Sequence, residues 1–280
     1  MLGMIQLPTP TQAILIRVGV DQTFGQWNAP CNPATGEFVY VPIPQNKPNA
    51  EGLARQYHPV ISSALETFSA RNGVDVRLPN QLLGRRMHLD PDFDYLSYGD
   101  TAIRGRRLLG LRENDWVVFY AGLRSVQGRS RLVYGLIGLL VVDCVRRVAN
   151  IPAVEHDWNA HTRLLDRMDT DIVVVGKPRL SGRFSRYLEI GEFRDRSYRV
   201  RLDLLDAWGG LSVADGWIQR SANPPFFLEP ARFAAWLGPR LPILQATNNP
   251  LAPLDKPDCT ASRKSGLDRI NTAKGPTGVE

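Results

Sequence analysis

The longest apolar stretches of the chain lie in its middle and predict two adjacent strands. Trp116–Tyr120 is rich in aromatic and β-branched residues, which favour strands in a packed sheet. Leu132–Val142 is a longer apolar run that only Gly135 and Gly138 interrupt. The polar residues 124–131 between the two runs include a glycine, as is typical of a solvated hairpin loop. We therefore expect this hairpin to form the core of the fold.

Shorter apolar runs predict three more strands, at residues 13–20, 36–44 and 171–178. The second of these contains Pro42 and Pro44, which lack the N–H that a central strand must donate. We therefore expect it at the edge of a sheet.

Four segments have a helical pattern. Residues 59–71 are the clearest, because their apolar residues lie on one face and an Asn-Gly pair follows them. Shorter helices are expected at 101–111 and 231–237, and a helix with good capping residues at 157–168.

Together these elements predict an α+β fold, with a mixed, strongly bent β-sheet and flanking helices. The predicted single domain covers residues 13–238 and follows a loose leader at 1–12. Residues 239–280 are rich in Pro, Asn, Ser and Thr with little apolar periodicity, so we expect a flexible tail that can be removed.

The charge balance permits an anionic partner without requiring one. The 280 residues carry 34 Lys and Arg against 28 Asp and Glu, a net charge of +6, and most of the cations are arginine. Arginine suits phosphate and base contacts, but a genome rich in arginine codons explains the excess equally well. Hydrophobic residues make up 43% of the chain, which is ordinary for a globular protein.

Cysteine usage and apolar run length indicate a reduced, cytoplasmic setting. The three cysteines, Cys31, Cys144 and Cys259, have no CxxC spacing and so favour neither a zinc site nor a disulfide framework. The N-terminal residues lack a basic segment followed by an apolar one, which argues against a secretory signal. The longest apolar run is well short of the ~18 residues that indicate a membrane span.

Three alternating carboxylates, Asp90, Asp92 and Asp94, with His88 close by, raise the question of a metal site. The spacing fits the start of a calcium loop, but the positions that require glycine and glutamate hold other residues. In an extended segment the carboxylates share one face and either hold Mg²⁺ or receive arginines from elsewhere. We expect the arginine-paired or solvated loop, and no metal site.

The sequence contains none of the motifs that would identify a particular reaction. The sequence has no GxxxxGK[ST] loop, no GxSxG elbow and no GxGxxG fingerprint. His156 and His161 are five residues apart, so HExxH-type zinc chemistry is not available.

Asp21, Asp100 and His161 are the candidate catalytic residues. Asp21 follows a predicted core strand, and His161 lies with Asn159 at the start of a predicted helix, where exposed N–H groups favour an anion. Both Asp21 and His161 can exchange a proton once their pKa is tuned. The plainer alternatives are a turn-forming aspartate and a capping or packing histidine.

Other residues are candidates for substrate binding. Ser181 and Arg183 follow a predicted strand in a loop that can cradle phosphate. Arg220 beside Trp217 can pair with an anion, although buried tryptophan is the more frequent explanation of such indoles. The remaining candidates bring aromatic rings and amides to the predicted pocket: Trp27, Asn28, Tyr120 and Asn159.

The segments that carry a family resemblance are Arg17–Asp21, Trp27–Pro30, Glu37–Pro44, Tyr98–Asp100, Asp115–Leu123, Tyr134–Gly138, Asn159–His161 and Val173–Gly176 followed by Ser181. In this order, over roughly residues 13–225, they resemble the nucleotide modification associated domain 3 family. The hairpin is also similar in style to PUA-like and EVE-like barrels, a likeness that concerns fold and not function.

The resemblance implies a protein of a nucleotide or DNA-base modification system, of phage or bacterial type. It implies nucleotide or DNA as a partner, with other modification proteins as further partners. The short apolar runs argue against a membrane partner. The resemblance does not identify the reaction, the cofactor or the catalytic residues, so the cofactor is unknown. Three classes stay open: an enzyme, a non-catalytic base reader, and a partner-binding component of such a system.

Overall fold

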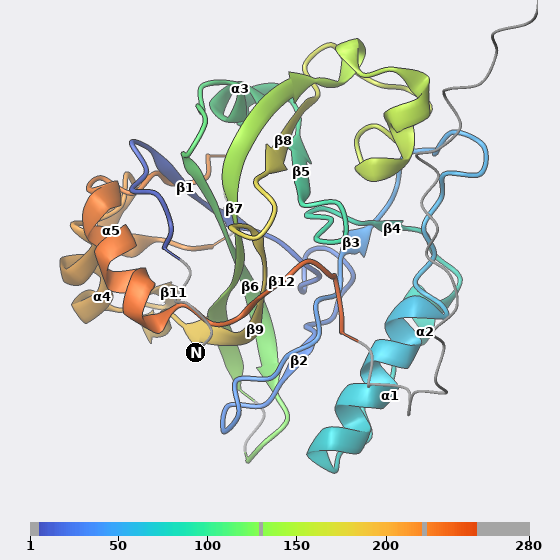
Figure 1. Ribbon diagram of the computed structural model, residues 1–280. Helices are drawn as coiled ribbons and strands as arrows, with labels where there is room; N and C mark the ends of the chain where they lie inside the picture. The colour runs from blue at the N-terminus through green and yellow to red at the C-terminus, as the bar shows by residue number, and fades with distance from the viewer. Residues whose placement is uncertain (1–5, 129–130, 220–222, 251–280) are drawn as a thin grey trace, which may run out of the picture. The chain divides into compact units, whose positions relative to one another are not determined.

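The predicted hairpin forms the two longest strands of the structure (Figure 1). The computed structural model describes residues 6–250 except 129–130 and 220–222. Strand β6 (Trp116–Ser125) pairs antiparallel with β7 (Leu132–Arg147), and their register shifts between Phe119 and Tyr120. The register of β7 also shifts against two further strands. Such irregularities bend strands and increase their twist.

The hairpin lies inside a mixed sheet of eight strands, whose main path runs β1-β6-β7-β8-β5. Strand β1 (Ala13–Arg17) runs parallel to β6. Strand β8 (Ile172–Gly176) runs antiparallel to β7, and β5 (Ser97–Asp100) antiparallel to β8. This arrangement confirms the predicted α+β fold with a mixed sheet.

Three further strands branch from this path. Strand β2 (Pro30–Cys31) pairs with β6, β9 (Gly182–Glu189) with β7, and β12 (Leu244–Gln245) with β9. Over the described part of the chain, no pairing closes the sheet into a barrel, so the suggested PUA-like barrel is not found.

Two small sheets complete the strands. One pairs β10 (Gly191–Arg194) with β11 (Ser197–Val200), and the other pairs β3 (Ile43–Pro44) with β4 (Met87–His88). Of the strand predicted at 36–44, only β3 is regular, and Phe38 adds an isolated bridge to Cys31.

Within the described residues, five α-helices flank the main sheet. They are α1 (Val60–Asn72), α2 (Asn80–Leu83), α3 (Ala102–Leu109), α4 (Leu202–Trp208) and α5 (Pro230–Leu237). Helices α1, α3 and α5 confirm three of the predicted helices. Figure 1 shows α4 and α5 on one side of the central hairpin and α1 and α2 on the other.

The helix predicted at 157–168 is wrong. The structure has a 3₁₀-helix at Ala153–Trp158 and then turns. The cause is local hydrogen bonding by polar side chains, which competes with a helix. Asn159 Oδ1 accepts from the His161 N–H, and Thr162 Oγ1 accepts from the Asn159 N–H and donates to a backbone carbonyl. The other 3₁₀-helices are Val148–Asn150, Ala214–Gly216 and Gly238–Arg240.

The main sheet is buried on both faces, which explains its long apolar runs. Side chains alternate along a strand, so Ile14 and Ile16 enter one core cluster while Ala13 and Leu15 enter another. The first cluster includes the buried face of α1, and the second includes that of α4 and α5. This burial on both sides holds the ends of β1, β5 and β8 in fixed positions.

Parts of the segments expected as leader and tail contact the domain. Thr11 Oγ1 donates to the Asp115 carboxylate at 2.7 Å. Near the other end, Asn248 Oδ1 accepts from the Phe93 N–H and its Nδ2 donates to Asp92. Residues 251–280 of the predicted tail lie outside the described residues. Among the residues that the structure describes, no helix has the length and apolar character needed to cross a membrane.

Candidate functional site

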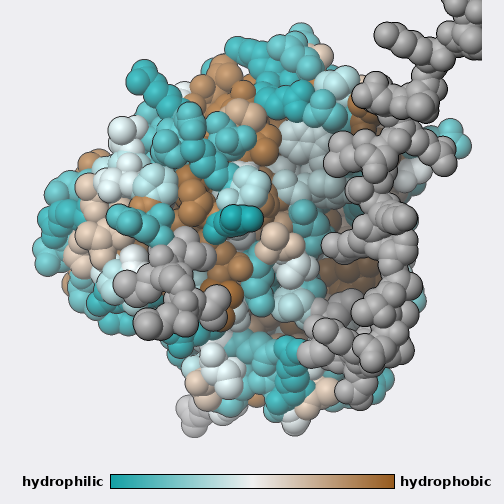
Figure 2. All heavy atoms as spheres, in the orientation of Figure 1, coloured by the Kyte–Doolittle hydropathy of each residue, from teal (hydrophilic) through white to brown (hydrophobic). Residues whose placement is uncertain are grey.

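A cavity of about 220 Å³ opens where β1, β4, β5 and the start of α3 come together. Its wall carries cations, carboxylates, imidazoles and amides in close proximity. The polar lining side chains are Arg17, Gln45, Asn46, Lys47, His88, Asp90, Tyr98, Asp100, Thr101, Arg104 and His161. On the face that Figure 2 shows, hydrophilic residues lie beside patches of hydrophobic ones.

Two of the three predicted catalytic residues, Asp100 and His161, line this cavity together. Asp100 ends β5 and is held by hydrogen bonds from the Tyr98 hydroxyl (2.8 Å) and the Thr101 N–H (2.9 Å). It also forms an ion pair with Arg104 at 3.2 Å. The roles assigned to these residues stay predictions.

His161 lies between two buried carboxylates. Its Nδ1 is 3.4 Å from Asp171 Oδ1, and its Nε2 is 3.6 Å from Asp90 Oδ2. Burial alone lowers the pKa of His161, but Asp171 and then Asp90 outweigh burial, so the pKa is raised above its usual value. The carboxylates of Asp171 and Asp90 thus orient the imidazole and interact with it electrostatically.

Asp90 is fixed by donors from two directions. The Gly99 N–H lies 3.0 Å from both carboxylate oxygens, and Asn159 Nδ2 donates to Oδ1 at 3.2 Å. Burial raises the pKa of this carboxyl to about 7, although His161 and the Gly99 N–H oppose the shift.

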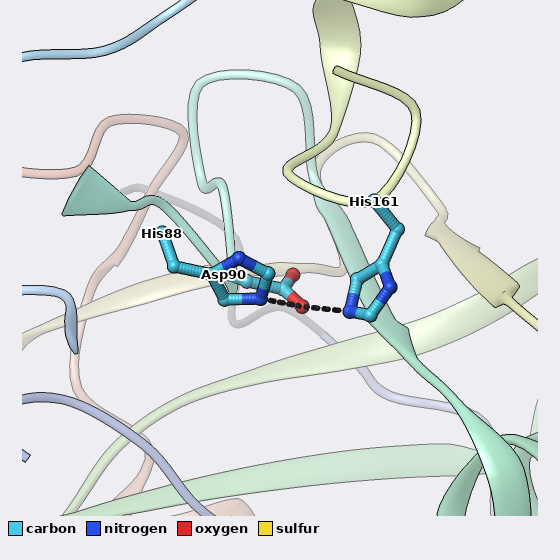
Figure 3. A group of neighbouring side chains, drawn as sticks. All are labelled: His88, Asp90 and His161. Atoms are coloured by element: carbon cyan, nitrogen blue, oxygen red, sulfur yellow. Dashed lines mark ion pairs between the residues drawn. The ribbon is translucent and has the colours of Figure 1, made fainter. Parts of the chain in front are cut away.

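Figure 3 shows the carboxylate of Asp90 between the rings of His88 and His161. The two ring centroids are 5.0 Å apart and the rings are nearly perpendicular, at 78°. His88 comes from β4, and burial, followed by the proximity of His161, lowers its pKa well below the usual range.

Sequence reasoning missed the place of His88 and Asp90 in this site. It grouped Asp90 with Asp92 and Asp94, but the structure separates the three. Asp92 forms an ion pair with Arg163 at 2.6 Å, as the arginine-paired alternative predicts, and Asp94 accepts from Asn248. The His-x-Asp spacing was the available signal, because alternate residues of an extended chain share a face.

Asn159 lies behind the cavity wall and positions the site. It is fully buried, it donates to Asp90 and to Ser97 Oγ, and it accepts from the His161 N–H. Its predicted contact with substrate is untested, but the structure gives it a role in orienting two of the lining side chains.

Asp21 also lies next to the wall. Its Oδ1 accepts from the N–H groups of Thr23 and Phe24, as in the turn-forming alternative. Its Oδ2 forms an ion pair with the cavity residue Arg17 at 3.1 Å. Asp21 thus fixes an arginine that faces the cavity.

The predicted binding residues near β6 do not line this cavity. Asn28 Nδ2 donates to the Gly122 carbonyl, and the Tyr120 hydroxyl donates to the Ile218 carbonyl. Trp27 is partly buried against a core cluster. Their hydrogen bonds and packing stabilise the fold, and their predicted binding roles are untested.

Ser181 and Arg183, predicted to bind phosphate, are buried and bonded within the sheet. Ser181 Oγ accepts from the Val141 N–H at 3.0 Å. Arg183 donates to the Phe38 carbonyl, and its guanidinium carbon lies 3.9 Å from the centre of the Phe38 ring. Arg220 lies outside the described residues.

A model of nucleotide modification associated domain 3 matches residues 12–203, which is most of the chain. The chain belongs to this family. The match confirms the resemblance found in the sequence, and all the described residues of the cavity wall fall inside the matched range. No curated protein and no solved structure matches the chain significantly. Membership in the nucleotide modification associated domain 3 family connects the chain with nucleotide modification systems.

Proposed function

We propose that the cavity binds a single nucleotide or nucleobase that a modification pathway acts on or recognises. The observation that supports this most strongly is the meeting of three cations, Arg17, Lys47 and Arg104, with His161 and buried carboxylates on one wall. Typical ligand pockets have volumes of about 300–1,000 Å³, so this cavity is smaller than most of them. Its size suits one base or nucleotide better than a folded nucleic acid.

The three cations provide the phosphate end of the proposed site. Arg17 is held by Asp21 and is 10% exposed, so it is rigid and close to the wall. Arg104 is 39% exposed and pairs with Asp100. Guanidinium groups suit phosphate because their N–H groups form two parallel hydrogen bonds to its oxygens.

Neutral side chains provide the contacts for a base. Gln45 and Asn46 carry amides that both donate and accept, as the edge of a base requires, and Phe24 offers a ring for stacking. By contrast, the aromatic residues Tyr40 and Phe119, which could have formed a reader's cage, are buried in the core.

A non-catalytic reader and an enzyme would use the end of the cavity formed by Asp90, Asp100 and His161 differently. A reader needs only hydrogen bonds there, whereas an enzyme needs these groups to act on the bound base. Acid–base roles for Asp21, Asp100 and His161 therefore remain a prediction within this proposal. The reaction and the identity of the base are not part of it.

The test is equilibrium binding of nucleosides, nucleoside monophosphates and short DNA duplexes, with and without modified bases, at two salt concentrations. We expect monophosphates to bind, with binding that persists when salt is raised. A duplex should bind less well, because a paired base reaches such a cavity only after it is flipped from the stack. Weak, base-independent binding that disappears with salt would reduce the proposal to non-specific attraction by surface arginines.

Arg104→Gln should weaken monophosphate binding about 10–150-fold and leave nucleoside binding nearly unchanged. The reason is the loss of a charge-assisted hydrogen bond to phosphate, worth about 1.5–3 kcal/mol. Calorimetric titration of both ligand types measures the difference. The matched control is Arg77→Gln, which removes an 84% exposed arginine, also paired with an aspartate, that does not line the cavity. Equal effects on both ligand types would contradict a phosphate contact.

A further inference from the structure

His88, Asp90 and His161 present one ligand atom each to a common space. Asp90 Oδ2 lies 3.8 Å from His88 Nε2 and 3.6 Å from His161 Nε2, and all three ligand atoms lie within 4.8 Å of one another. Figure 3 shows both rings directing a nitrogen toward the same carboxylate. The three residues come from β4, from the segment after it and from the turn at 159–164, so only the tertiary fold brings them together.

These separations suit an ion better than direct hydrogen bonds. Hydrogen bonds between nitrogen and oxygen are about 2.7–3.2 Å long, so the two imidazoles stand too far from Asp90 to bond it well. Ligand atoms in a tetrahedral shell with bonds of about 2.0–2.2 Å are about 3.3–3.6 Å apart. The separations of 3.8 and 3.6 Å between Asp90 and the two imidazoles are close to this spacing.

The groups behind these ligands hold them in the orientation that a metal requires. Asp171 lies at Nδ1 of His161, which leaves Nε2 free to face the other two ligands. Metal-binding histidines commonly have a carboxylate at this position. Asp171 is itself fixed by the Met168 N–H, and Asp90 by the Gly99 N–H and Asn159.

The surroundings also supply negative charge and access. Asp90, Asp100 and Asp171 all approach His161, and Arg104 pairs with Asp100. Asp90, which contributes the carboxylate, is 2% exposed, and His161, which contributes one of the imidazoles, is 9% exposed. Both side chains nevertheless line the cavity. An ion here would have three protein ligands and further positions open to the cavity, as in catalytic metal sites.

We propose that His88, Asp90 and His161 bind one first-row divalent transition-metal ion, of the Zn²⁺ or Fe²⁺ class, at the wall of the cavity. Two imidazoles and one carboxylate suit these ions, whereas Mg²⁺ and Ca²⁺ prefer shells of oxygen. The proposal departs from the sequence analysis, which predicts no metal site because it treats Asp90 and His161 separately. It does not depend on nucleotide binding.

The test uses the full chain, stripped of metal with a chelator and then titrated with Zn²⁺ in competition with a chromophoric chelator. We expect one Zn²⁺ per chain and no competition from Mg²⁺ at the same concentration. His88→Gln and His161→Gln should abolish this binding. Asp171→Asn should weaken it about 10–100-fold, because the carboxylate behind a ligating histidine contributes to metal affinity without touching the ion.

The matched control is His58→Gln. His58 is exposed, its ring is 3.2 Å from Ser62 and it does not line the cavity, so its loss should leave Zn²⁺ binding unchanged. Absence of Zn²⁺ binding by the unmodified chain, or binding that survives His88→Gln and His161→Gln, would overturn the proposal. Either result would leave these three residues as a polar cluster that binds no metal.

A measurement on the unmodified chain tests the proposal even if the variants fail to fold. Co²⁺ in this site should shift the ring-proton resonances of two histidines strongly in the NMR spectrum, and those of His58 and His156 should stay in their usual range. A spectrum without shifted imidazole signals at one equivalent of Co²⁺ contradicts the assignment. No nucleotide is present in these experiments, so their failure is distinguishable from failure of the proposed nucleotide binding.

Discussion

Replacing Arg163 by leucine is expected to destabilise the protein by about 3–5 kcal/mol. Arg163 Nη2 donates to Asp92 Oδ2 at 2.6 Å, and the two side chains are 2% and 1% exposed. The substitution leaves the Asp92 carboxylate buried without its cation, and an uncompensated buried charge costs more than the intact pair stabilises. Urea unfolding followed by circular dichroism measures the loss.

Two variants test this explanation. Arg77→Leu removes an arginine from an exposed pair with Asp75, where we expect a change of about 0–1 kcal/mol. The double variant Asp92→Asn/Arg163→Leu should recover part of the loss, because no charge then remains buried. If Arg163→Leu costs no more than Arg77→Leu, the buried pair does not carry the stability assigned to it.

The buried pair also matters for the site. Arg163 lies two residues after His161, and its Nε donates to the Asp157 carbonyl at 2.7 Å. Asp92 lies two residues after Asp90 and accepts from Asn248. The pair therefore connects the two segments that carry these cavity residues, which both lie outside the named helices and strands.

The sheet could be predicted from the sequence because its signal is local. Trp116–Tyr120 and Leu132–Val142 are long apolar runs separated by a polar loop, and burial on both faces requires just such runs. The helix at residues 60–72 was equally readable, because one apolar face and a terminal glycine define it.

The turn that carries His161 could not be predicted in this way. Capping residues at 157–159 favour a helix in isolation, but Asn159 and Thr162 bond to nearby backbone groups and to the distant Asp90. The local bonds compete directly with a helix, whereas the bond to Asp90 forms only when the fold brings the two segments together. Helix propensity alone therefore gave the wrong prediction.

Only part of the candidate site could be predicted from the sequence. Asp100 and His161 lie in two of the segments that resemble the family, Tyr98–Asp100 and Asn159–His161, and His161 also lies among polar residues. His88 and Asp90 are close in sequence, but nothing local indicates that a turn some 70 residues later completes the group. Arg183 shows the opposite case. An arginine after a strand predicts phosphate binding, a role that stays a prediction, and the structure buries this side chain against Phe38.

Gly99→Ala should abolish Zn²⁺ binding, or weaken it at least about 10–100-fold, and should also weaken nucleotide binding. A Cβ atom at this position would lie 2.6 Å from His161 Cδ2 and 2.9 Å from Asn159 Oδ1. Neither neighbour can yield without cost, because both are buried and Asn159 also holds Asp90. The imidazole would be displaced from the carboxylate that it faces.

The substitution acts through contact and not through the backbone. Gly99 does not have a positive φ, so alanine can adopt its conformation, and its pairing with Val173 in the sheet can persist. We therefore expect a folded protein with a modest loss of stability, of about 1–3 kcal/mol as for other overpacked positions.

Gly84→Ala is the control, since a Cβ there meets nothing within 4 Å. If Gly99→Ala matches that control in affinity for both Zn²⁺ and nucleoside monophosphate, the position of His161 does not govern either site. An effect on Zn²⁺ alone would separate the metal site from the nucleotide contacts, because it would place His161 among the ligands of the ion and outside the surface that holds the base.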